Sequence, residues 1–484
     1  MADAPLSPIW WVKRLHKAML ERCRTDGHRL SIDDLDDYYR GRPTRLPWLP
    51  EQARDEFYRL LELTKSNYMG LVIDATAERL CVEGFRIGDD AEADDETWDI
   101  WQNSNFDNDS DQAILEALIT GQSYALVTPG ATPDDLPMLY AEHPSQAIVE
   151  YVPGCGRRET AAGLKVWKDD WTGRYMATLY LPDAIFKFEA INVNASSVDG
   201  INWRRRSVAG EVWPLPNPLG EVLLVELPNN PRLLTGGVSE IADVTAVQDR
   251  ICKTLADRLM TQDFGAFPQK WAIGFPDEDA QGRQNRIDVG RNRMVTSDIA
   301  ETKFGQWDSA ALDPYSAAKR EDVKDIASRT RTPAQYLLGE MSNVNGETLK
   351  AAESGLVSKV RQRQRSYGES LERLVGLARR AAGLGDPSET IETIWRNPEF
   401  RTEGELVDAL VKMATIGVPH EALWERWGAT PLEIERWKAM AEEAATRDIA
   451  GQITALTGQQ MPAMPAGDQQ PAEPYPPAAP GDAG

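Results

Sequence analysis

The sequence has few of the residues that build metal centres and disulfide frameworks. It contains four cysteines and four histidines among 484 residues, and neither type forms a pair at the spacing of metal ligands. The cysteines lie far from one another, with no CxxC pair, at Cys23, Cys81, Cys155 and Cys252. We therefore expect reduced and buried thiols, and neither a disulfide scaffold nor a zinc site.

Motifs that bind nucleotides or support hydrolysis are also missing. There is no GKS or GKT, so the chain lacks the Walker A loop of an ATPase. Neither HExxH nor GxSxG occurs. Gly154–Gly156 begins like a dinucleotide fingerprint, but the third glycine is absent. No pair of carboxylates stands out as an acid/base couple, and we expect no catalytic residues and no cofactor.

One acidic run imitates the start of a calcium loop. Asp107, Asp109 and Asp111 match the first EF-hand ligands, but Gln112 stands where glycine is needed and Leu118 where the bidentate glutamate is needed. Acidic side chains also favour the N-terminus of a helix, because they complement its dipole. This second explanation fits better, and it predicts a helix that begins at Gln112 and holds no metal.

Long apolar runs are absent. No run approaches 18 consecutive apolar residues, so the sequence predicts no transmembrane helix and no membrane partner. The N-terminus has charges inside its apolar stretch and no cleavage-site pattern, which makes it a poor secretory signal. Hydrophobic residues make up 42% of the chain, as in globular proteins, and its length allows a large core and more than one domain.

Positive charge is scarce as well. Lys and Arg number 53 against 76 Asp and Glu, which gives a net charge of −23 at pH 7. A protein that grips DNA tightly presents a basic surface, and this chain cannot do so over most of its area. Taken alone, a net charge of this size indicates only solubility.

Between Gly121 and Leu227 the sequence predicts an antiparallel sheet. Turn residues recur about every ten positions and separate short runs rich in β-branched and aromatic residues: SYALVT, QAIVEYV, GLKVWKD, YMATLYL and AIFKFEA. Trp203–Arg206 is predicted to lie between strands. Its three arginines could meet phosphate, but a solvated hairpin tip is the commoner case.

Two helical segments flank an insert that contains glycine and proline, and a long third helix follows. The first covers 238–262, where apolar residues recur at three- and four-residue spacing. The second covers 313–332, with Asp313 as a possible cap and Pro314 at the first helical position. The third covers 347–382 and should be longer than most globular helices.

The C-terminal part predicts three short helices and then a tail without a core. Thr402 and Glu405 form a possible capping box, and Gly417 stands where a helix should stop. From about Gln459 the composition is rich in Pro, Ala and Gly. Such a composition cannot bury a core, so we expect disorder there.

Several stretches resemble, in order, the bacteriophage portal proteins of phages that infect actinobacteria. The stretches that carry the resemblance are Ser66–Ile87, Trp98–Asn105, Gly121–Val127, Leu227–Leu259, Thr332–Leu356 and Ile416–Trp437. No single stretch is a chemical motif. The specificity lies in their number and in their order along most of the chain.

The resemblance implies an α+β fold of the phage portal type, with long stem and wing helices and an antiparallel β region. The parts that it implies are a wing (1–237), stem helices (238–262 and 313–332), a clip (263–312), a tunnel loop (333–346), a long wing helix with a return strand (347–400), crown helices (401–447) and a disordered tail (448–484). It also implies a homo-oligomeric ring, of twelve subunits, around a channel for DNA at one capsid vertex.

The resemblance further implies a set of partners for genome packaging and ejection. They are double-stranded DNA, which would pass without sequence specificity, the terminase large subunit, the major capsid protein and a head–tail adaptor. The implied location is the virion, after assembly in the host cytoplasm. A net acidic channel wall would repel phosphates and let DNA slide, which agrees with the charge of the chain.

Three sets of residues follow as predicted sites. The tunnel loop should present to DNA its polar and aromatic side chains, Gln335, Tyr336, Glu340, Asn343 and Asn345. The clip should dock the packaging motor through its basic residues, Arg283, Arg286, Arg291 and Arg293. The third helix carries eight bases and four acids, and some of its bases should pair within the subunit while others reach the next one. The bases proposed for contacts between subunits are Arg361, Arg363 and Arg365.

Two alternatives stay open on sequence grounds. One is another structural protein of the phage head, such as a capsid or head–tail adaptor protein without a tunnel. The other is a carboxylate-dependent nuclease or hydrolase. The absence of metal-ligand and nucleophile spacings counts against this second alternative.

Overall fold

The computed structural model describes residues 4–23, 30–42, 63–88, 93–130, 135–156, 159–191, 201–233, 236–266, 270–274, 303–306, 311–339, 346–386, 388–399 and 403–427, together with 429, 434 and 436–440. The chain divides into two units, Met1–Pro398 and Glu399–Gly484. We describe each unit by itself.

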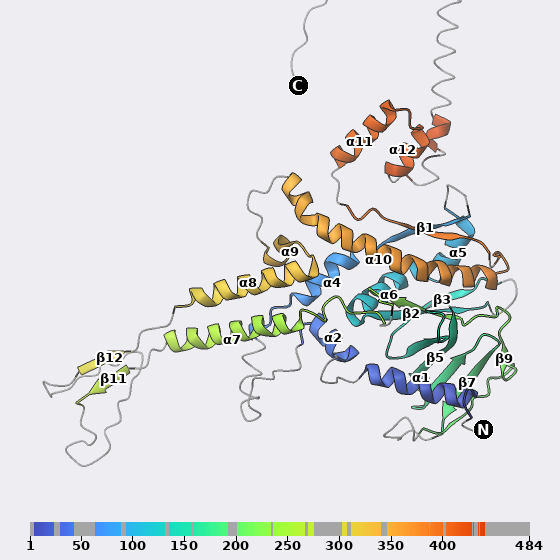
Figure 1. The fold of residues 1–484 in the computed structure, drawn as a ribbon, viewed down its shortest axis with the longest axis horizontal. Coiled ribbons are helices and arrows are strands. Elements are labelled where there is room, and N and C mark those ends of the chain that lie inside the picture. Colours follow the sequence, from blue (N-terminus) through green and yellow to red (C-terminus); the bar gives the residue numbers. More distant parts are fainter. Residues whose placement is uncertain are drawn as a thin grey trace, which may run out of the picture. The chain divides into compact units, whose positions relative to one another are not determined.

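Five helices precede most of the strands of the first unit (Figure 1). They are α1 (Pro8–Arg22), α2 (Ile32–Tyr39), α4 (Met69–Ala77), α5 (Asp95–Asn103) and α6 (Phe106–Thr120). Local capping explains several of their starts: the Ser31 hydroxyl accepts from Asp34 N–H while the Asp34 carboxylate accepts from Ser31 N–H. Asp94 caps α5 in the same way, by accepting from Thr97 N–H.

The larger sheet is antiparallel, as the alternating runs predicted. Its strands in spatial order are β4 (Ala147–Tyr151), β5 (Thr160–Lys168), β6 (Tyr175–Tyr180), β7 (Ala184–Ala190) and β8 (Trp203–Arg205), with β9 (Leu215–Pro216) also paired to β7. Helix α1 covers one face of this sheet. Trp11, Val12 and Leu15 of α1 form a buried cluster with side chains of β4 to β8, including Phe188 and Trp203.

A smaller antiparallel sheet lies in the main core. It consists of β10 (Leu224–Pro228), β2 (Gln122–Thr128) and β3 (Met138–Glu142), with β2 in the centre. Apolar side chains of β2, β3 and β10 join those of α4, α6 and the long helices in one buried cluster. This cluster is the largest in the subunit and fixes the helices described next.

Two long helices run antiparallel to each other (Figure 1). They are α7 (Thr245–Ala266) and α8 (Asp313–Thr330). Arg250 of α7 forms an ion pair with Asp322 of α8 at 2.7 Å, and Thr261 donates to the Tyr315 hydroxyl at 3.1 Å. Between them in the chain lies a β-hairpin-like pair, β11 (Lys270–Ile273) with β12 (Lys303–Gln306).

The chain then returns along the core. The short helix α9 (Ala334–Leu338) precedes α10 (Gly346–Ala381), a helix of 36 residues, as the sequence predicted. The strand β13 (Ile391–Trp395) follows and pairs antiparallel with β1 (Val82–Ile87) from the other end of the unit. Tyr367, Leu371 and Leu374 of α10 are fully buried in the core.

The second unit contains α11 (Glu403–Thr415) and α12 (His420–Trp427). Gly417 ends the first of these with φ +92°, a conformation that favours glycine, as predicted. Thr402 and residues 441–484, which include the predicted disordered tail, lie outside the described residues.

The structure differs from the sequence predictions at three element boundaries. Helix α7 begins at Thr245 rather than Val238, α6 begins at Phe106 rather than Gln112, and Trp203–Arg205 is a strand of the larger sheet rather than a hairpin tip. The first difference has consequences, because 236–244 packs as irregular backbone under α10. Among the described residues, no helix is long and apolar enough to cross a membrane.

Candidate functional site at the junction of the long helices

The segment 236–244 is held out of helical conformation by contacts with the chain after β10 and with the end of α6. Val238 N–H donates to Asn229 C=O at 2.8 Å, and Glu240 N–H donates to Leu118 C=O at 3.0 Å. Gly237 packs so closely on Gly121 that a Cβ atom built on Gly237 would lie 1.7 Å from the Gly121 carbonyl oxygen. These contacts place the Glu240 side chain against α10.

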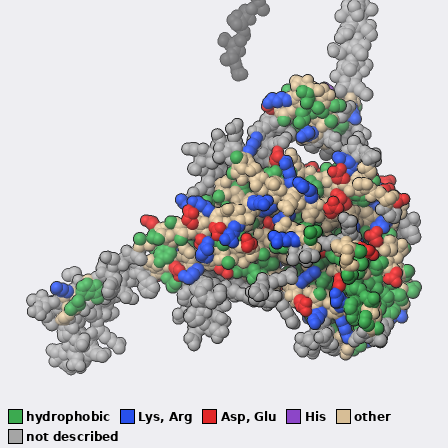
Figure 2. Space-filling model, in the orientation of Figure 1, with side chains coloured by type: hydrophobic (Ala, Val, Ile, Leu, Met, Phe, Trp, Pro, Cys, Tyr) green, Lys and Arg blue, Asp and Glu red, His purple; other side chains and the backbone are tan. Residues whose placement is uncertain are grey.

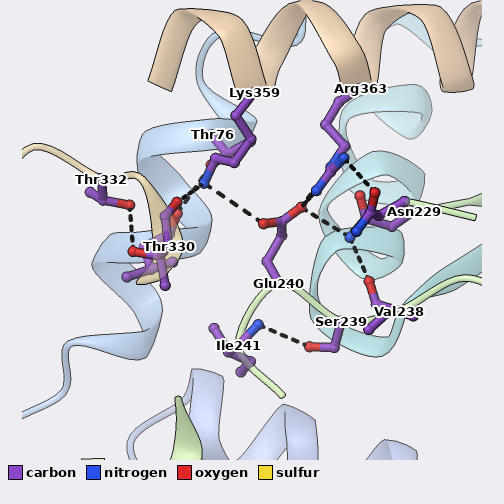
Figure 3. Close-up of polar contacts among 12 residues, drawn as sticks. Thr76, Asn229, Val238, Ser239, Glu240, Ile241, Thr330, Thr332, Lys359 and Arg363 are labelled. Atoms are coloured by element: carbon purple, nitrogen blue, oxygen red, sulfur yellow. Dashed lines mark hydrogen bonds and ion pairs between the residues drawn. The ribbon is translucent and has the colours of Figure 1, made fainter. Parts of the chain in front are cut away.

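Glu240 binds two cationic side chains of α10 (Figure 3). Arg363 approaches one carboxylate oxygen with two nitrogen atoms, Nη2 at 2.5 Å and Nε at 2.6 Å. The Lys359 Nζ lies 3.7 Å from the other oxygen. Asn229 also donates to Glu240, at 3.2 Å, and Tyr367 O–H donates to the Asn229 side-chain oxygen at 3.2 Å. The carboxylate is therefore the centre of a network that includes several elements.

This cluster is almost completely removed from water. The side chains of Lys359, Arg363 and Glu240 are 4%, 6% and 7% exposed, respectively. One carboxylate thus faces two buried cations. Burial lowers the pKa of Lys359, the nearby Arg363 lowers it further, and Glu240 opposes both effects. The Glu240 carboxylate is therefore the counter-ion of both Lys359 and Arg363.

Lys359 also contacts the end of α8. Its ammonium group donates to the Thr330 carbonyl at 2.9 Å, and Thr330 is the last residue of that helix (Figure 3). The Thr330 and Thr332 hydroxyl groups are 3.0 Å apart, in a hydrogen bond. A helix leaves its last carbonyl groups without internal partners, and Lys359 satisfies one of them. The cluster therefore connects the chain before α7, the end of α8 and the middle of α10.

A second polar contact fixes α9 to α10. The Tyr336 hydroxyl donates to the Glu353 carboxylate and accepts from Arg79 at 2.9 Å. Arg79 lies 3.7 Å from Glu353, and both side chains are mostly buried. Burial first, and then the hydrogen bond to Glu353, raises the pKa of Tyr336 to about 12. The segment between α8 and α10 is thus anchored on both sides by polar contacts to α10.

Comparison with known proteins assigns the family. The model of the phage portal family described as "Phage portal protein, SPP1 Gp6-like" matches residues 27–447. The chain belongs to this family. It is a portal subunit, a structural component of the phage particle rather than an enzyme, and the family forms ring oligomers in phage particles.

Two curated portal proteins are similar to this portal subunit over most of their length. The portal protein of Mycobacterium phage D29 is 30% identical over 408 residues, which cover 80% of this chain and 81% of that protein. The portal protein of Mycobacterium phage L5 is 29% identical over 407 residues and covers 80% of each. A solved chain titled "Virion of native gene transfer agent (GTA) particle" has 11% identity and a TM-score of 0.42, with 86% of this chain and 99% of that chain covered.

The structure places two residues of the predicted tunnel loop in the portal subunit. Gln335 and Tyr336 belong to α9, where the sequence suggested an irregular polar connection. Tyr336 is turned toward Glu353 and Arg79 of its own subunit, so its hydroxyl is not available to face DNA. Glu340, Asn343 and Asn345 lie outside the described residues, as do all of the clip arginines, Arg283, Arg286, Arg291 and Arg293.

The eight bases of α10 differ in their surroundings. Five of them pair with carboxylates of the same subunit, namely Lys359, Arg363, Arg373, Arg379 and Arg380. Lys350, Arg361 and Arg365 are exposed. Because Arg363 is buried against Glu240, it acts inside the portal subunit, and a contact between subunits can involve only Arg361 and Arg365 of the predicted three.

Sequence reasoning missed Glu240, because it lies in a segment predicted to be helical. Its cationic partners, Lys359 and Arg363, are more than a hundred positions away, and no local pattern marks it as buried. The cysteine prediction holds in part: all four thiols are free, but only Cys252 is buried and Cys155 is exposed. Among the described residues, no group of three or more His, Cys, Asp or Glu side chains could hold a metal ion.

The three arginines after Trp203 have structural partners. Arg204 donates to Glu189 at 2.7 Å, while Arg205 and Arg206 lie over the rings of Trp213 and Trp167 at 5.1 Å from the ring centroid in each case. These contacts account for the basic run without phosphate. The run therefore has structural partners on a strand of the larger sheet, and not at the hairpin tip that the sequence predicted.

Proposed function

We propose that this portal subunit assembles into a closed ring of twelve copies around a channel, through which double-stranded DNA enters and leaves the capsid without sequence-specific contacts. One observation carries the proposal. The antiparallel pair α7 and α8 is joined to α10 by the Glu240 cluster and continues, at the other end, into the chain that contains β11 and β12. A rod of two helices with a small module at one end suits a channel wall.

The proposal also assigns the parts of the portal fold. We assign α7 and α8 as stem helices, the chain from 267 to 312 as the clip, and α9 with the residues up to 346 as the tunnel loop. Helix α10 and β13 complete the wing, to which the N-terminal helices and sheets also belong. The helices α11 and α12 form the crown.

The acidic net charge supports passage rather than binding of DNA. With 76 acidic against 53 basic residues, the net charge of the chain repels phosphate groups. A conduit benefits from weak contacts, because each phosphate contact with a Lys or Arg adds salt-dependent affinity. In this proposal Gln335, Glu340, Asn343 and Asn345 approach the DNA as a polar ring, and the ring slides along the duplex.

The clip is the proposed docking surface for the packaging motor. Its arginines, Arg283, Arg286, Arg291 and Arg293, make it locally basic in an acidic chain. Charged rims mainly set association rate and register. The terminase large subunit would bind there during packaging in the host cytoplasm and the head–tail adaptor afterwards, while the major capsid protein would surround the ring.

Imaging of the purified subunit tests this proposal directly. Negative-stain micrographs should show ring-shaped particles with a central hole, and mass measurement in solution should give twelve subunits. Monomers under all conditions, including the presence of capsid protein, would contradict the ring. A disc without a central hole would contradict the channel.

A further inference from the structure

We propose that neighbouring subunits in the ring are held together by the acidic face of α5 on one copy, which contacts a groove along α10 on the next. This inference rests on the proposed ring and names the two surfaces that close it. Closed rings require that two different patches of one chain fit each other. The two surfaces below differ in shape and in charge.

The groove lies beside the exposed side of α10. It has a volume of about 680 Å³ and is lined by α10 side chains that include Gln362, Arg365, Ser366 and Glu369, and by the chain after β10 at Asn230. Arg365 is exposed and forms no ion pair with any described residue. Arg361 is exposed one helical turn earlier on α10. The lining holds the guanidinium groups of Arg365 and Arg373 beside the carboxylates of Glu226 and Glu369, and its guanidinium, amide and hydroxyl groups are donors for carboxylate ligands.

The partner surface is the most acidic part of the chain. Between Ile87 and Gly156 the sequence has fifteen Asp and Glu residues and no Lys or Arg. The acids are densest at the start of α5. Asp95, Glu96 and Asp99 are exposed there and form no ion pair with any described residue, whereas Asp94 is engaged by Arg379 at 2.7 Å. Three exposed carboxylates on one short helix therefore have no counter-charge in the part of the subunit that the structure describes.

The two surfaces also differ in charge. Arg361 and Arg365 are exposed on α10, whereas α5 exposes only acidic side chains among its charged residues. Figure 2 shows both signs of charge mixed over α8, and Asp and Glu side chains toward β1 and α5. Copies that meet through these two regions bring opposite charges together. Copies that meet through like regions bring equal charges together, which disfavours a wrong register. The same contrast gives a role to Arg365, which is exposed on α10 and forms no ion pair with any described residue.

Charge exchange between the surfaces tests the proposal. The groove variant is Arg361→Glu/Arg365→Glu, and the acidic-face variant is Glu96→Lys/Asp99→Lys. Each should form rings only at concentrations about tenfold or more above the parent, because attraction becomes repulsion at every interface. The double-surface variant, with all four changes, should assemble again. Lys17→Glu/Lys168→Glu, at exposed positions on α1 and β5, is a control with the same change in net charge as the groove variant, and it should assemble like the parent.

Mixing gives the sharpest outcome. At the concentration at which the parent assembles, neither single-surface variant should form rings alone. An equimolar mixture should form rings in which the two alternate, since each acidic groove then meets a basic α5. Native mass spectrometry of the full chain would detect equal numbers of the two. Normal assembly of the groove variant would overturn the pairing. The pairing would also be overturned if neither the mixture nor the four-change variant assembled while their melting curves matched that of the parent. If the parent itself forms no rings, the proposed ring fails instead.

Discussion

Replacing Glu240 with glutamine should destabilise the subunit more than any other single change at the junction. The substitution keeps the size of the side chain and removes its charge. Arg363 and Lys359 then stay buried, at 6% and 4% side-chain exposure, without a counter-ion. Burial, and after it the neighbouring Arg363, already lowers the pKa of Lys359, and Glu240 no longer offsets these effects.

The magnitude follows from the distances. At an effective dielectric constant of about 20, a unit charge pair gains about 6 kcal/mol at the 2.6 Å separation of Arg363 and about 4 kcal/mol at the 3.7 Å separation of Lys359. Desolvation of each ion offsets much of this gain. Loss of one partner from a buried pair costs about 3–5 kcal/mol, and we expect Glu240→Gln to fall in this range.

Lys359→Met is the matched control. It removes the second cation and its hydrogen bond to Thr330, but leaves the closer Glu240–Arg363 pair intact. We expect a cost of about 1 kcal/mol, near the net value of one hydrogen bond. In the double variant, removal of Lys359 should recover part of the loss, because only one cation then lacks a partner.

Urea denaturation of the parent, the two single variants and the double variant measures this double-mutant cycle. All four are compared at one protein concentration, because assembly adds to the apparent stability. A Glu240→Gln midpoint equal to that of the parent would refute the reasoning. So would a larger loss for Lys359→Met than for Glu240→Gln, since the cluster would then depend on the lysine rather than on the carboxylate.

Three further outcomes are expected. Burial lowers the pKa of His16 from 6.5 to about 4, so the unfolded chain binds a proton more readily than the folded chain. The free energy of unfolding should therefore be highest above pH 6.5 and fall by about 3 kcal/mol as the pH drops to about 4. In His16→Leu this part of the difference between urea melts at pH 7 and pH 4.5 should disappear. Gly237→Ala should lower the free energy of unfolding by at least about 1–3 kcal/mol in the same melts, because the new Cβ would lie 1.7 Å from the Gly121 oxygen. The control Gly355→Ala within α10 should be neutral or stabilising, and equal effects of the two changes would contradict the close approach. Deletion of Met341–Asn345 should leave rings intact and impair DNA packaging or retention in a packaging assay, and normal packaging would contradict a DNA-facing role for the tunnel loop.

The sequence predicted the long elements well because their signals are local. The 36 residues of α10 have apolar side chains at helical spacing and many strong helix formers. The strands around β5 and β6 are short runs of β-branched and aromatic residues that turn residues separate. The start of α7 could not be placed in this way. Ile241 and Val244 are buried whether or not their segment is helical, so the apolar spacing continues through residues that the contacts of Asn229 and Gly121 hold in irregular backbone.

The polar sites were harder to predict for the same physical reason. The local sequence around a charged residue such as Arg363 is the same whether its side chain faces solvent, a neighbouring subunit or Glu240. Which of these holds depends on a partner 123 positions away. Arg361 and Arg365, two positions to either side on α10, point elsewhere and stay exposed. Alternation along the helix indicated different faces, but it could not say which face is inside.

The pairing of β1 with β13 sets the order in which the subunit can be completed. Arg86 and Glu392, which form an ion pair across these strands, are 306 positions apart. A ribosome needs about 15–60 s to cover that distance at about 5–20 residues per second. During this time β1 has no strand partner, and a two-stranded sheet is marginal without further packing. A chain cut short before Ile391 never closes this sheet, so prematurely terminated copies remain open and are poor competitors for a place in the ring.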